Sequence, residues 1–418
     1  MKKKYLQFFN ATIALTALIF IFVLFSWGCN EEENVAPLYD KTFSNIAAPE
    51  ILSISPADSA FAGVDEITIT GNNFPTSPNK LSVFFNNVPV TILSVDANKI
   101  VVKAPNLVSD SIGIKVNKFD ADQLSNIFNY KLISATLTFV KFNPLNTPYA
   151  LTFDKNGNAY VSLKLDKTGD GIKKITPDGT ITNFAPKGTE TFWSSLKFGQ
   201  SGDLYAARNL KGIYKVAQNT APAVWIAPSS GIGNVTDFDF DQNGMLWAGG
   251  NNTAVYRVTQ TKNVKAFPFT GIVRSVRVFN NFLYVGGLQD GTEGVWRFPI
   301  INPDSLGTAE LYYDYKAVYP TGAILGITFS ADGDLYIGTG GVETIVVVKT
   351  DKSSQVLFSG VLNPLNKSLF NSFYWGSCVY LYFIRQAMDA ADAATAPVAI
   401  IKVNTKNTLG GAPYFGNN

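Results

Sequence analysis

A short pattern of apolar and turn-forming residues returns about six times in the later part of the chain. Clear copies occupy residues 153–161, 198–206, 240–248 and 329–337, with a shortened copy at 278–285 and a degenerate one at 373–382. Each clear copy has an apolar end, a turn that contains Gly, and a run of aromatic and β-branched residues. Gly and Asn tolerate the positive φ angles of tight turns, so each copy predicts a β-hairpin.

The spacing of these hairpins predicts how they assemble. The aromatic residues near the start of each second strand are 45, 42, 37, 52 and 46 residues apart, and they are Tyr160, Tyr205, Trp247, Tyr284, Tyr336 and Tyr382. A repeat of this length holds roughly four strands, which is typical of propeller blades. We therefore expect an all-β chain in which residues 134–418 form a six-bladed β-propeller. Segment 135–142 should supply the outer strand of the last blade and close the ring.

Residues 48–133 have a different pattern. Ile67 and Ile69 alternate with threonines, and short strands follow every eight to twelve residues, which predicts a small β-sandwich. The opening phrase that ends at Pro56, the Ile-Thr-Ile-Thr-Gly-x-x-Phe core at 67–74 and the closing Ala-Pro at 104–105 resemble an IPT/TIG domain. This resemblance implies an immunoglobulin-like fold that serves as a spacer or docking module.

The N-terminal segment predicts export. Lysines at positions 2–4 precede an apolar run at 11–27, and Ser26-Trp27-Gly28-Cys29 is followed by Asn and three Glu residues. This resembles the lipobox of Bacteroidetes-type lipoproteins, although Ser26 replaces the usual Leu and Trp27 is bulky. The resemblance implies a signal peptide at 1–28, lipidation of Cys29 and anchoring in the outer membrane, facing the cell exterior. The polar, aperiodic residues that follow predict a flexible tether at 29–47. The alternative is a single membrane-spanning helix with an incidental cysteine.

The composition of the chain excludes several kinds of catalytic site and partner. The chain contains no His, which removes the commonest general base and zinc ligand. Loss of three lysines with a signal peptide leaves 31 basic residues against 32 acidic ones, a net charge of about −1, so we expect no nucleic-acid partner. Cys378 would be the only cysteine besides Cys29, and no disulfide framework is expected.

The repeats resemble six-bladed propellers of the NHL and SMP-30/gluconolactonase-like group, and ligands of propellers generally bind at the central mouth. Alignment of the inner strands predicts mouth residues, which are Tyr149, Trp193, Asp237, Arg274 and Asn371, with Leu325 and Phe370 as further positions. Tyr149 and Trp193 would stack on a sugar ring, and Asp237 and Arg274 would bind hydroxyl or carboxylate groups. Alternatively, the aromatic rings fill the channel and Asp237 pairs with Arg274.

These observations favour a lipid-anchored surface protein that captures a ligand without catalysis or a cofactor. By analogy with surface lipoproteins of this layout, we expect a glycan ligand and an outer-membrane transporter partner in a nutrient-uptake system. The alternative is a metal-dependent lactonase or a lyase that uses Asp237, Asp239 and Asn234. The resemblance to SMP-30-like enzymes is weakened because Tyr149 stands where they carry a glutamate. A third hypothesis is an envelope scaffold or adhesin.

Overall fold

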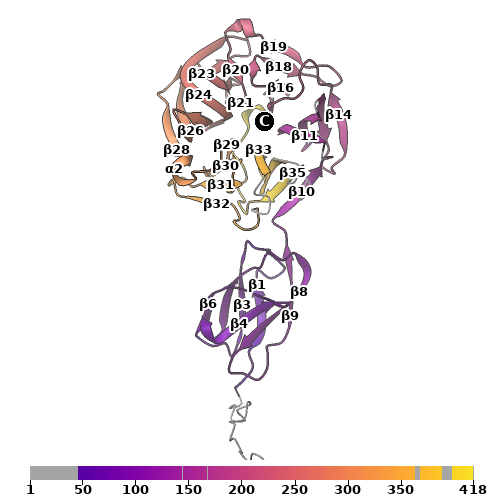
Figure 1. Ribbon diagram of the computed structural model, residues 1–418, viewed down its shortest axis with the longest axis vertical. Coiled ribbons are helices and arrows are strands. Elements are labelled where there is room, and N and C mark those ends of the chain that lie inside the picture. Colours follow the sequence, from indigo (N-terminus) through magenta and orange to yellow (C-terminus); the bar gives the residue numbers. More distant parts are fainter. Residues whose placement is uncertain (1–45, 144, 167, 363–367, 388–397, 418) are drawn as a thin grey trace, which may run out of the picture.

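The computed structural model describes residues 46–143, 145–166, 168–362, 368–387 and 398–417. The predicted signal peptide, the lipidation site Cys29 and nearly all of the tether lie outside the described residues. Within the described residues the chain is almost entirely strands, arranged as a small sandwich followed by a ring of sheets (Figure 1). No helix in this part of the chain is long and apolar enough to span a membrane. The predicted all-β fold class is confirmed.

The sandwich has two facing sheets. One sheet contains β1 (Glu50–Ser55), β3 (Glu66–Asn72), β7 (Lys99–Lys103) and β6 (Ile92–Asp96). The other contains β2 (Ala60–Phe61), β9 (Phe128–Ile133), β8 (Ser109–Lys118), β4 (Leu81–Phe85) and β5 (Val88–Pro89). Ile67 and Ile69 of β3 are fully buried between the sheets, as their alternation with threonine predicts.

The first three blades of the ring follow the predicted order. Blade 1 contains β11 (Asn146–Phe153), β12 (Ala159–Leu165), β13 (Thr168–Ile175) and β14 (Ile181–Ala185). Blade 2 contains β15 (Ser195–Phe198), β16 (Leu204–Ala207), β18 (Ile213–Val216) and β19 (Ala223–Ile226). Blade 3 contains β21 (Asp237–Phe240), β22 (Leu246–Gly249), β23 (Asn251–Val258) and the first half of β24 (Val264–Phe279).

The second half of β24 becomes the inner strand of blade 4, because it pairs with β25 (Phe282–Gln289). Blade 4 is completed by β26 (Thr292–Asn302) and β28 (Glu310–Asp314). Blade 5 contains β29 (Ile324–Phe329), β30 (Leu335–Thr339), β31 (Ile345–Val348) and β32 (Ser354–Val356). Blade 6 contains β33 (Ser368–Trp375), β34 (Tyr380–Ala387), β35 (Ala399–Asn404) and β10 (Thr136–Lys141).

Short elements connect these strands. They are β17 (Leu210–Lys211), β20 (Asn234–Val235), β27 (Ser305–Leu306), the one-turn helix α2 (Tyr315–Val318) and the 3-10 turns η1 (Pro78–Lys80), η2 (Pro228–Ser230) and η4 (Phe415–Asn417). The ring closes as predicted, because β10 pairs in antiparallel fashion with β35. The outer strand of the last blade therefore comes from the start of the propeller, and this pairing covers the exposed edge of β35.

The recurring sequence pattern is the hairpin between the first two strands of each blade. In blade 1, Phe153 pairs with Ala159, and the Asp154 carboxylate accepts hydrogen bonds from the backbone N–H groups of Asn156 and Asn158. Gly157 has a φ of 78°, a value that few side chains tolerate. The Asp-x-Asn-Gly phrase is therefore a hairpin turn, as predicted.

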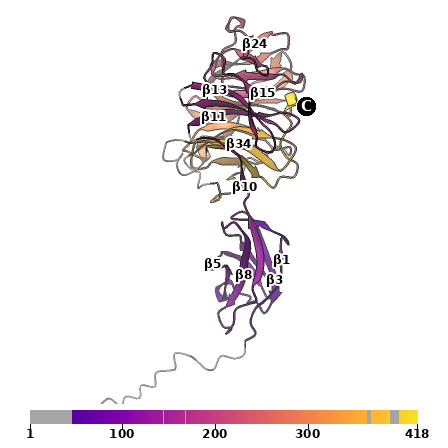
Figure 2. The ribbon, with the colours of Figure 1, turned by 90° about the vertical axis from the view of Figure 1, so that its right-hand side faces the viewer.

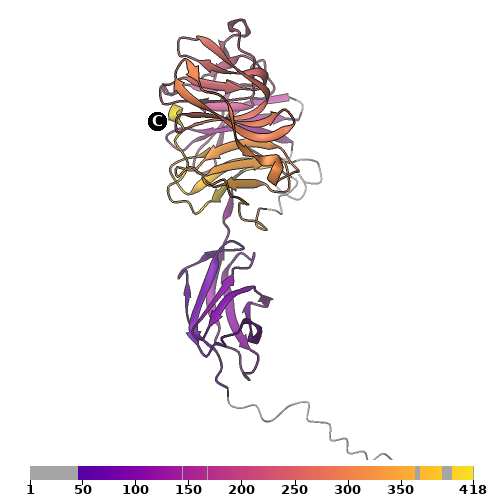
Figure 3. The same ribbon diagram turned by 90° about the vertical axis from the view of Figure 1, so that its left-hand side faces the viewer.

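The sandwich extends from the rim of the ring and covers neither of its faces (Figures 2 and 3). At the junction, Lys406 Nζ lies 2.5 Å from Asp65 Oδ1, and Asn106 Nδ2 donates to the carbonyl of Gly360 at 3.3 Å. Asp65 also accepts a hydrogen bond from the backbone N–H of Phe61. The sandwich therefore leaves both faces of the ring uncovered.

Candidate functional site

A cavity of about 180 Å³ lies at the end of the channel where the inner strands begin. We call it the mouth. Its lining comes from blades 1 to 6, and it consists of Tyr149, Ser194, Ser195, Leu196, Lys197, Thr236, Asp237, Arg274, Ser275, Leu325, Ile327, Ser372 and Phe373. The positions predicted at Tyr149, Asp237, Arg274 and Leu325 thus meet in one cavity. Their proposed roles in ligand binding stay predictions.

Asp237 links three blades at the wall of the mouth. Its Oδ1 accepts a hydrogen bond from Ser195 Oγ at 2.6 Å. Its Oδ2 accepts from Ser275 Oγ at 3.1 Å and from the backbone N–H of Val276 at 2.7 Å. Ser275 Oγ also accepts from the backbone N–H of Ile327 in blade 5. The carboxylate is thereby held in one orientation by donors on both sides.

Arg274 does not pair with Asp237, so the alternative pairing considered from the sequence is wrong. Its guanidinium lies 2.6 Å from Glu293 Oε1 and also donates to the carbonyl of Ile324 at 3.3 Å. Glu293 Oε1 accepts from the backbone N–H of Ile324 at 2.7 Å, which ties it to blade 5. Glu293 is almost fully buried, whereas the Arg274 side chain keeps 25% exposure and reaches the mouth.

Tyr149 forms part of an aromatic stack at the rim. Its ring lies 4.0 Å from that of Phe192 at an interplanar angle of 20°. The Arg208 guanidinium covers the Phe192 ring at 4.9 Å and pairs with Glu190. Burial raises the pKa of the Tyr149 phenol, and Arg208 offsets part of this rise. Tyr149 is thus a neutral, braced ring at neutral pH.

The structure corrects the placement of Trp193. Its side chain is 1% exposed, packs on Tyr214 at 4.8 Å between ring centroids, and does not line the mouth. The adjacent residues Phe192 and Ser194 occupy the positions that the sequence pattern assigned to Trp193. Asn371 lies in β33 opposite Ile384, next to the lining residue Ser372, and its side chain is outside the described residues.

The residues behind the mouth pack against a segment that the sequence pattern did not assign. The C-terminal segment runs to the centre of the ring, on one face of the propeller (Figures 1 and 2). There, Lys197 lies over the Tyr414 ring at 5.0 Å, and Arg277 lies over it at 3.7 Å. The Tyr414 hydroxyl contacts Thr328 Oγ1 at 3.1 Å and the carbonyl of Phe373 at 3.4 Å. Tyr414 therefore packs against two residues that line the mouth, Lys197 and Phe373, while its own ring lines the cavity at the other end of the channel.

A buried ion pair holds this segment. Arg277 and Asp239 are 1% and 2% exposed, and their nearest charged atoms are 2.6 Å apart. Arg277 also donates to the carbonyls of Ala412 and Pro413. Burial alone would lower the pKa of Arg277, but Asp239 and Tyr414 outweigh it and raise the pKa above its usual value. The guanidinium is therefore charged and fixed.

The fit of this segment depends on glycines. A Cβ on Gly411 would lie 2.3 Å from the Trp375 carbonyl oxygen, and one on Gly416 would lie 1.8 Å from that of Phe198. Both distances are far below van der Waals contact, so larger residues would displace the segment. The glycines in the 410–416 phrase, with Tyr414 between them, were the signal in the sequence for close packing.

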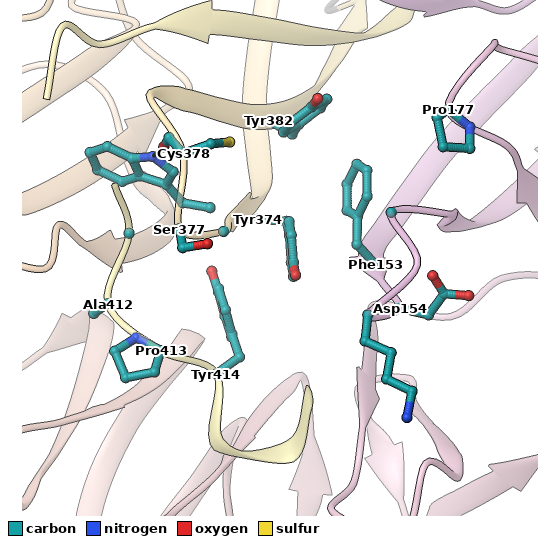
Figure 4. Close-up of a pocket in the computed structure, with 15 residues that line it drawn as sticks. Phe153, Asp154, Pro177, Tyr374, Ser377, Cys378, Tyr382, Ala412, Pro413 and Tyr414 are labelled. Carbon is teal, nitrogen blue, oxygen red and sulfur yellow. Dashed lines mark hydrogen bonds between the residues drawn. The ribbon is translucent and has the colours of Figure 1, made fainter. Parts of the chain in front are cut away.

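A larger cavity of about 620 Å³ lies at the opposite end of the channel, where the inner strands end. We call it the seam groove, because it lies between blade 1, blade 6 and the C-terminal segment. Its lining residues are Phe153, Asp154, Lys155, Gly157, Pro177, Tyr374, Trp375, Gly376, Ser377, Cys378, Tyr382, Gly411, Ala412, Pro413 and Tyr414. Figure 4 shows the rings of Tyr414, Tyr374 and Phe153 in a row across it.

The residues named for a metal-dependent enzyme do not form a metal site. Asp239 is taken up by Arg277 and by the backbone N–H of Val278. Asn234 lies in β20, where its backbone is bonded by the side chain of Asn252. Among the described residues, no group of three or more Asp, Glu or Cys side chains is arranged to bind a metal ion. The donor set therefore does not fit the ligands of such a metal.

Comparison with known proteins supports the division of the chain. Residues 49–131 match the family model of the IPT/TIG domain. No curated protein matches the chain in sequence. The family match therefore covers the sandwich, and the propeller is compared with solved structures by its fold.

Several solved structures are similar in fold. A putative phosphatase from Bacteroides thetaiotaomicron is 12% identical with a TM-score of 0.57, covering 87% of this chain and 98% of that one. An auxiliary nutrient binding protein from the same organism is 12% identical with a TM-score of 0.47, covering 86% and 98%. Virginiamycin B lyase from Staphylococcus aureus is 15% identical with a TM-score of 0.44, covering 78% and 99%. The first of these similarities shows that the two proteins share a fold.

Proposed function

We propose that the protein is a lipid-anchored cell-surface binding protein whose propeller mouth captures the end of a glycan without catalysis. The observation that carries this proposal is the mouth itself, a small cavity with a braced aromatic ring on its rim and fixed polar groups on its wall. Such a combination suits a sugar ring, whose C–H face packs on an aromatic ring and whose hydroxyls take directed hydrogen bonds.

The size of the mouth supports a small ligand. Its volume of about 180 Å³ is below the ~300–1,000 Å³ typical of sites for drug-sized ligands. A cavity of this size would admit only one end of a longer chain. We therefore propose recognition of a terminal sugar.

The arrangement of the polar groups supports binding over catalysis. Asp237 already accepts three hydrogen bonds, and Arg274 is held by Glu293. Fixed groups of this kind position hydroxyls. Lys197 adds a further donor, and the Ser194 and Thr236 hydroxyls, which donate to Thr236 O and Asn209 Oδ1, can still accept. In the proposed nutrient-uptake role, the IPT/TIG domain is a spacer and an outer-membrane transporter receives the glycan.

Titration calorimetry of the purified full-length protein in detergent, against a panel of monosaccharides and oligosaccharides, tests the proposal. Tyr149→Ala removes the ring from the rim, and we expect about tenfold weaker binding, equal to about 1.4 kcal/mol. Tyr149→Phe keeps the stack on Phe192 and is the matched control. Equal affinities for the wild type and Tyr149→Ala would contradict the role of the mouth.

The anchor has a separate test. Cells that express the wild type or Cys29→Ser are labelled with radioactive palmitate, and their surface is probed with an antibody to the IPT/TIG domain. We expect label and surface signal only for the wild type, since the thioether-linked acyl chains require the cysteine. Label in the Cys29→Ser variant would contradict lipidation at this residue.

A further inference from the structure

The seam groove has the properties of a binding site, although the mouth alone accounts for the proposed function. Its volume of about 620 Å³ falls within the ~300–1,000 Å³ range of ligand sites. It lies on the opposite face of the ring, which the sandwich leaves uncovered (Figure 3). We propose that this groove is a second carbohydrate site, which takes several rings of a neutral oligosaccharide. The ligand class rests on the proposed function, whereas the location does not.

The walls of the groove are fixed in advance of any ligand. The Tyr374 ring stacks on Phe153 at 4.5 Å and on Tyr414 at 5.1 Å, with interplanar angles of 24° and 12° (Figure 4). Trp375 Nε1 donates to the carbonyl of Cys378 at 2.8 Å and holds the turn beside the groove. Binding to rigid walls loses less conformational entropy than binding to mobile ones.

The lining combines apolar surfaces with hydroxyl groups. Tyr374 and Tyr382 are half-buried, and Pro177 and Pro413 are exposed beside them. Phe153 and Tyr414 cover the two faces of the Tyr374 ring, so the C–H groups of sugars would pack on Tyr382 and the two prolines. Ser377 supplies an exposed hydroxyl at the edge. Burial raises the pKa of the Tyr382 phenol, so this group is also a neutral hydroxyl at neutral pH. Both can donate to and accept from the hydroxyls of a glycan.

The charges around the groove favour a neutral ligand. Among the described lining residues, Lys155 is the only cation and Asp154 the only acidic group. Asp154 is engaged, because its carboxylate accepts from two backbone N–H groups, from Asn158 Nδ2 and from Tyr160 OH. A phosphate-bearing ligand would require several free donors with positive charge, and a lipid tail would require a lining without polar groups.

The test fills the groove with a side chain while it leaves the mouth intact. Ser377→Arg places a long side chain at the exposed edge. Ser201→Arg, at an exposed position in the corresponding turn of blade 2, is the matched control. The probes are neutral hexasaccharides of β-1,4-glucan, β-1,4-xylan, α-1,4-glucan and β-1,3-glucan, together with their monosaccharides. Affinity is measured by calorimetry on the full-length protein, and circular dichroism confirms that each variant is folded.

We expect Ser377→Arg to weaken hexasaccharide binding by about tenfold or more, with no change in Ser201→Arg. Monosaccharide binding should depend on Tyr149 and be unaffected by Ser377→Arg. If hexasaccharide binding is lost in Tyr149→Ala and retained in Ser377→Arg, the groove is not a carbohydrate site and the mouth is. Hexasaccharide binding that depends on Ser377 but not Tyr149, without monosaccharide binding, would support the groove and overturn the mouth. No binding by any probe would overturn both.

Discussion

The two ends of the central channel are built from the same six inner strands, yet they differ in character. At the mouth, polar side chains from successive blades are bonded to one another and leave a small cavity. At the other end, aromatic rings and the C-terminal segment line a groove more than three times as large. The repeated blades therefore form the ring, and residues outside the repeat pattern make the two ends of the channel different.

The boundary between the two ends is the layer that contains Asp239, Arg277 and Tyr414. Arg277 pairs with Asp239 of the neighbouring blade, donates to the C-terminal segment and covers the Tyr414 ring. The buried guanidinium of Arg277 thus holds both the neighbouring blade and the C-terminal segment in place. If this account is correct, substitutions in the layer should affect stability most, and those at the rim should affect ligand affinity.

The largest effect is expected for Asp239→Ala. It leaves the Arg277 guanidinium buried without its ion partner, which costs about 3–5 kcal/mol in the free energy of unfolding. Urea unfolding monitored by tryptophan fluorescence measures the loss. The double variant Asp239→Leu/Arg277→Met removes both charges and should recover part of the stability. A loss below about 1 kcal/mol, as for an exposed pair, would show that the layer is not sealed.

Tyr414→Ala should follow, with a loss of about 3 kcal/mol, because deletion of a buried aromatic ring leaves a cavity. Tyr414→Phe keeps the ring against Arg277 and Tyr374 and loses only the hydroxyl bonds, so about 1 kcal/mol is expected. The same urea titration compares them. Equal losses in the two variants would show that the ring does not pack as described.

Ser195→Ala removes one of the three donors to Asp237 and should cost about 1.5 kcal/mol, the value of a hydrogen bond to a charged group. Ser201→Ala, whose hydroxyl bonds Asp203 in an exposed turn, is the matched control and should be nearly neutral. Thermal unfolding by calorimetry measures both. If the two variants have the same melting temperature, the Asp237 network does not contribute to the wall of the mouth.

The smallest effect on stability is expected at the rim. Phe192→Leu removes the stack under Tyr149, which is worth about 1 kcal/mol, and should weaken glycan binding to a similar extent. Trp193→Phe changes a buried neighbour that does not reach the mouth, so it should alter stability and leave affinity unchanged. Calorimetric titration measures the glycan affinity of both variants. If only Trp193→Phe lost affinity, then Trp193 and not Phe192 would support the rim of the mouth.

Much of the fold could be predicted, because hairpin turns and aromatic spacing repeat in the sequence. The closing strand was predicted from the alternation in segment 135–142, and β10 confirms it. The mouth was predicted by alignment of the inner strands on an apolar residue near the end of each strand, which is Phe in four of them and Val278 in the other. Tyr149, Arg274 and Leu325 then fell into one cavity with Asp237.

The errors have physical reasons. Tyr149 stands four residues before Phe153, and Ser194 stands four before Phe198, whereas Trp193 is one residue further. Trp193 lies in the loop before β15, where its side chain packs on Tyr214, whereas the residues from Ser194 onward line the mouth. The C-terminal segment has no counterpart in the blade pattern, so the repeats could not predict its position. Its glycines indicate close packing, but the sequence alone does not show that the packing partner is the centre of the ring.

The central claim is that the mouth holds the ligand, and nuclear magnetic resonance tests it most directly. The full-length protein is labelled at the Leu and Ile methyl groups and titrated to saturation with the monosaccharide that binds best in calorimetry. We expect shifts at Leu325 and Ile327, which line the mouth, and none at Leu52 of the sandwich. Saturation without a shift at either mouth residue would contradict the claim.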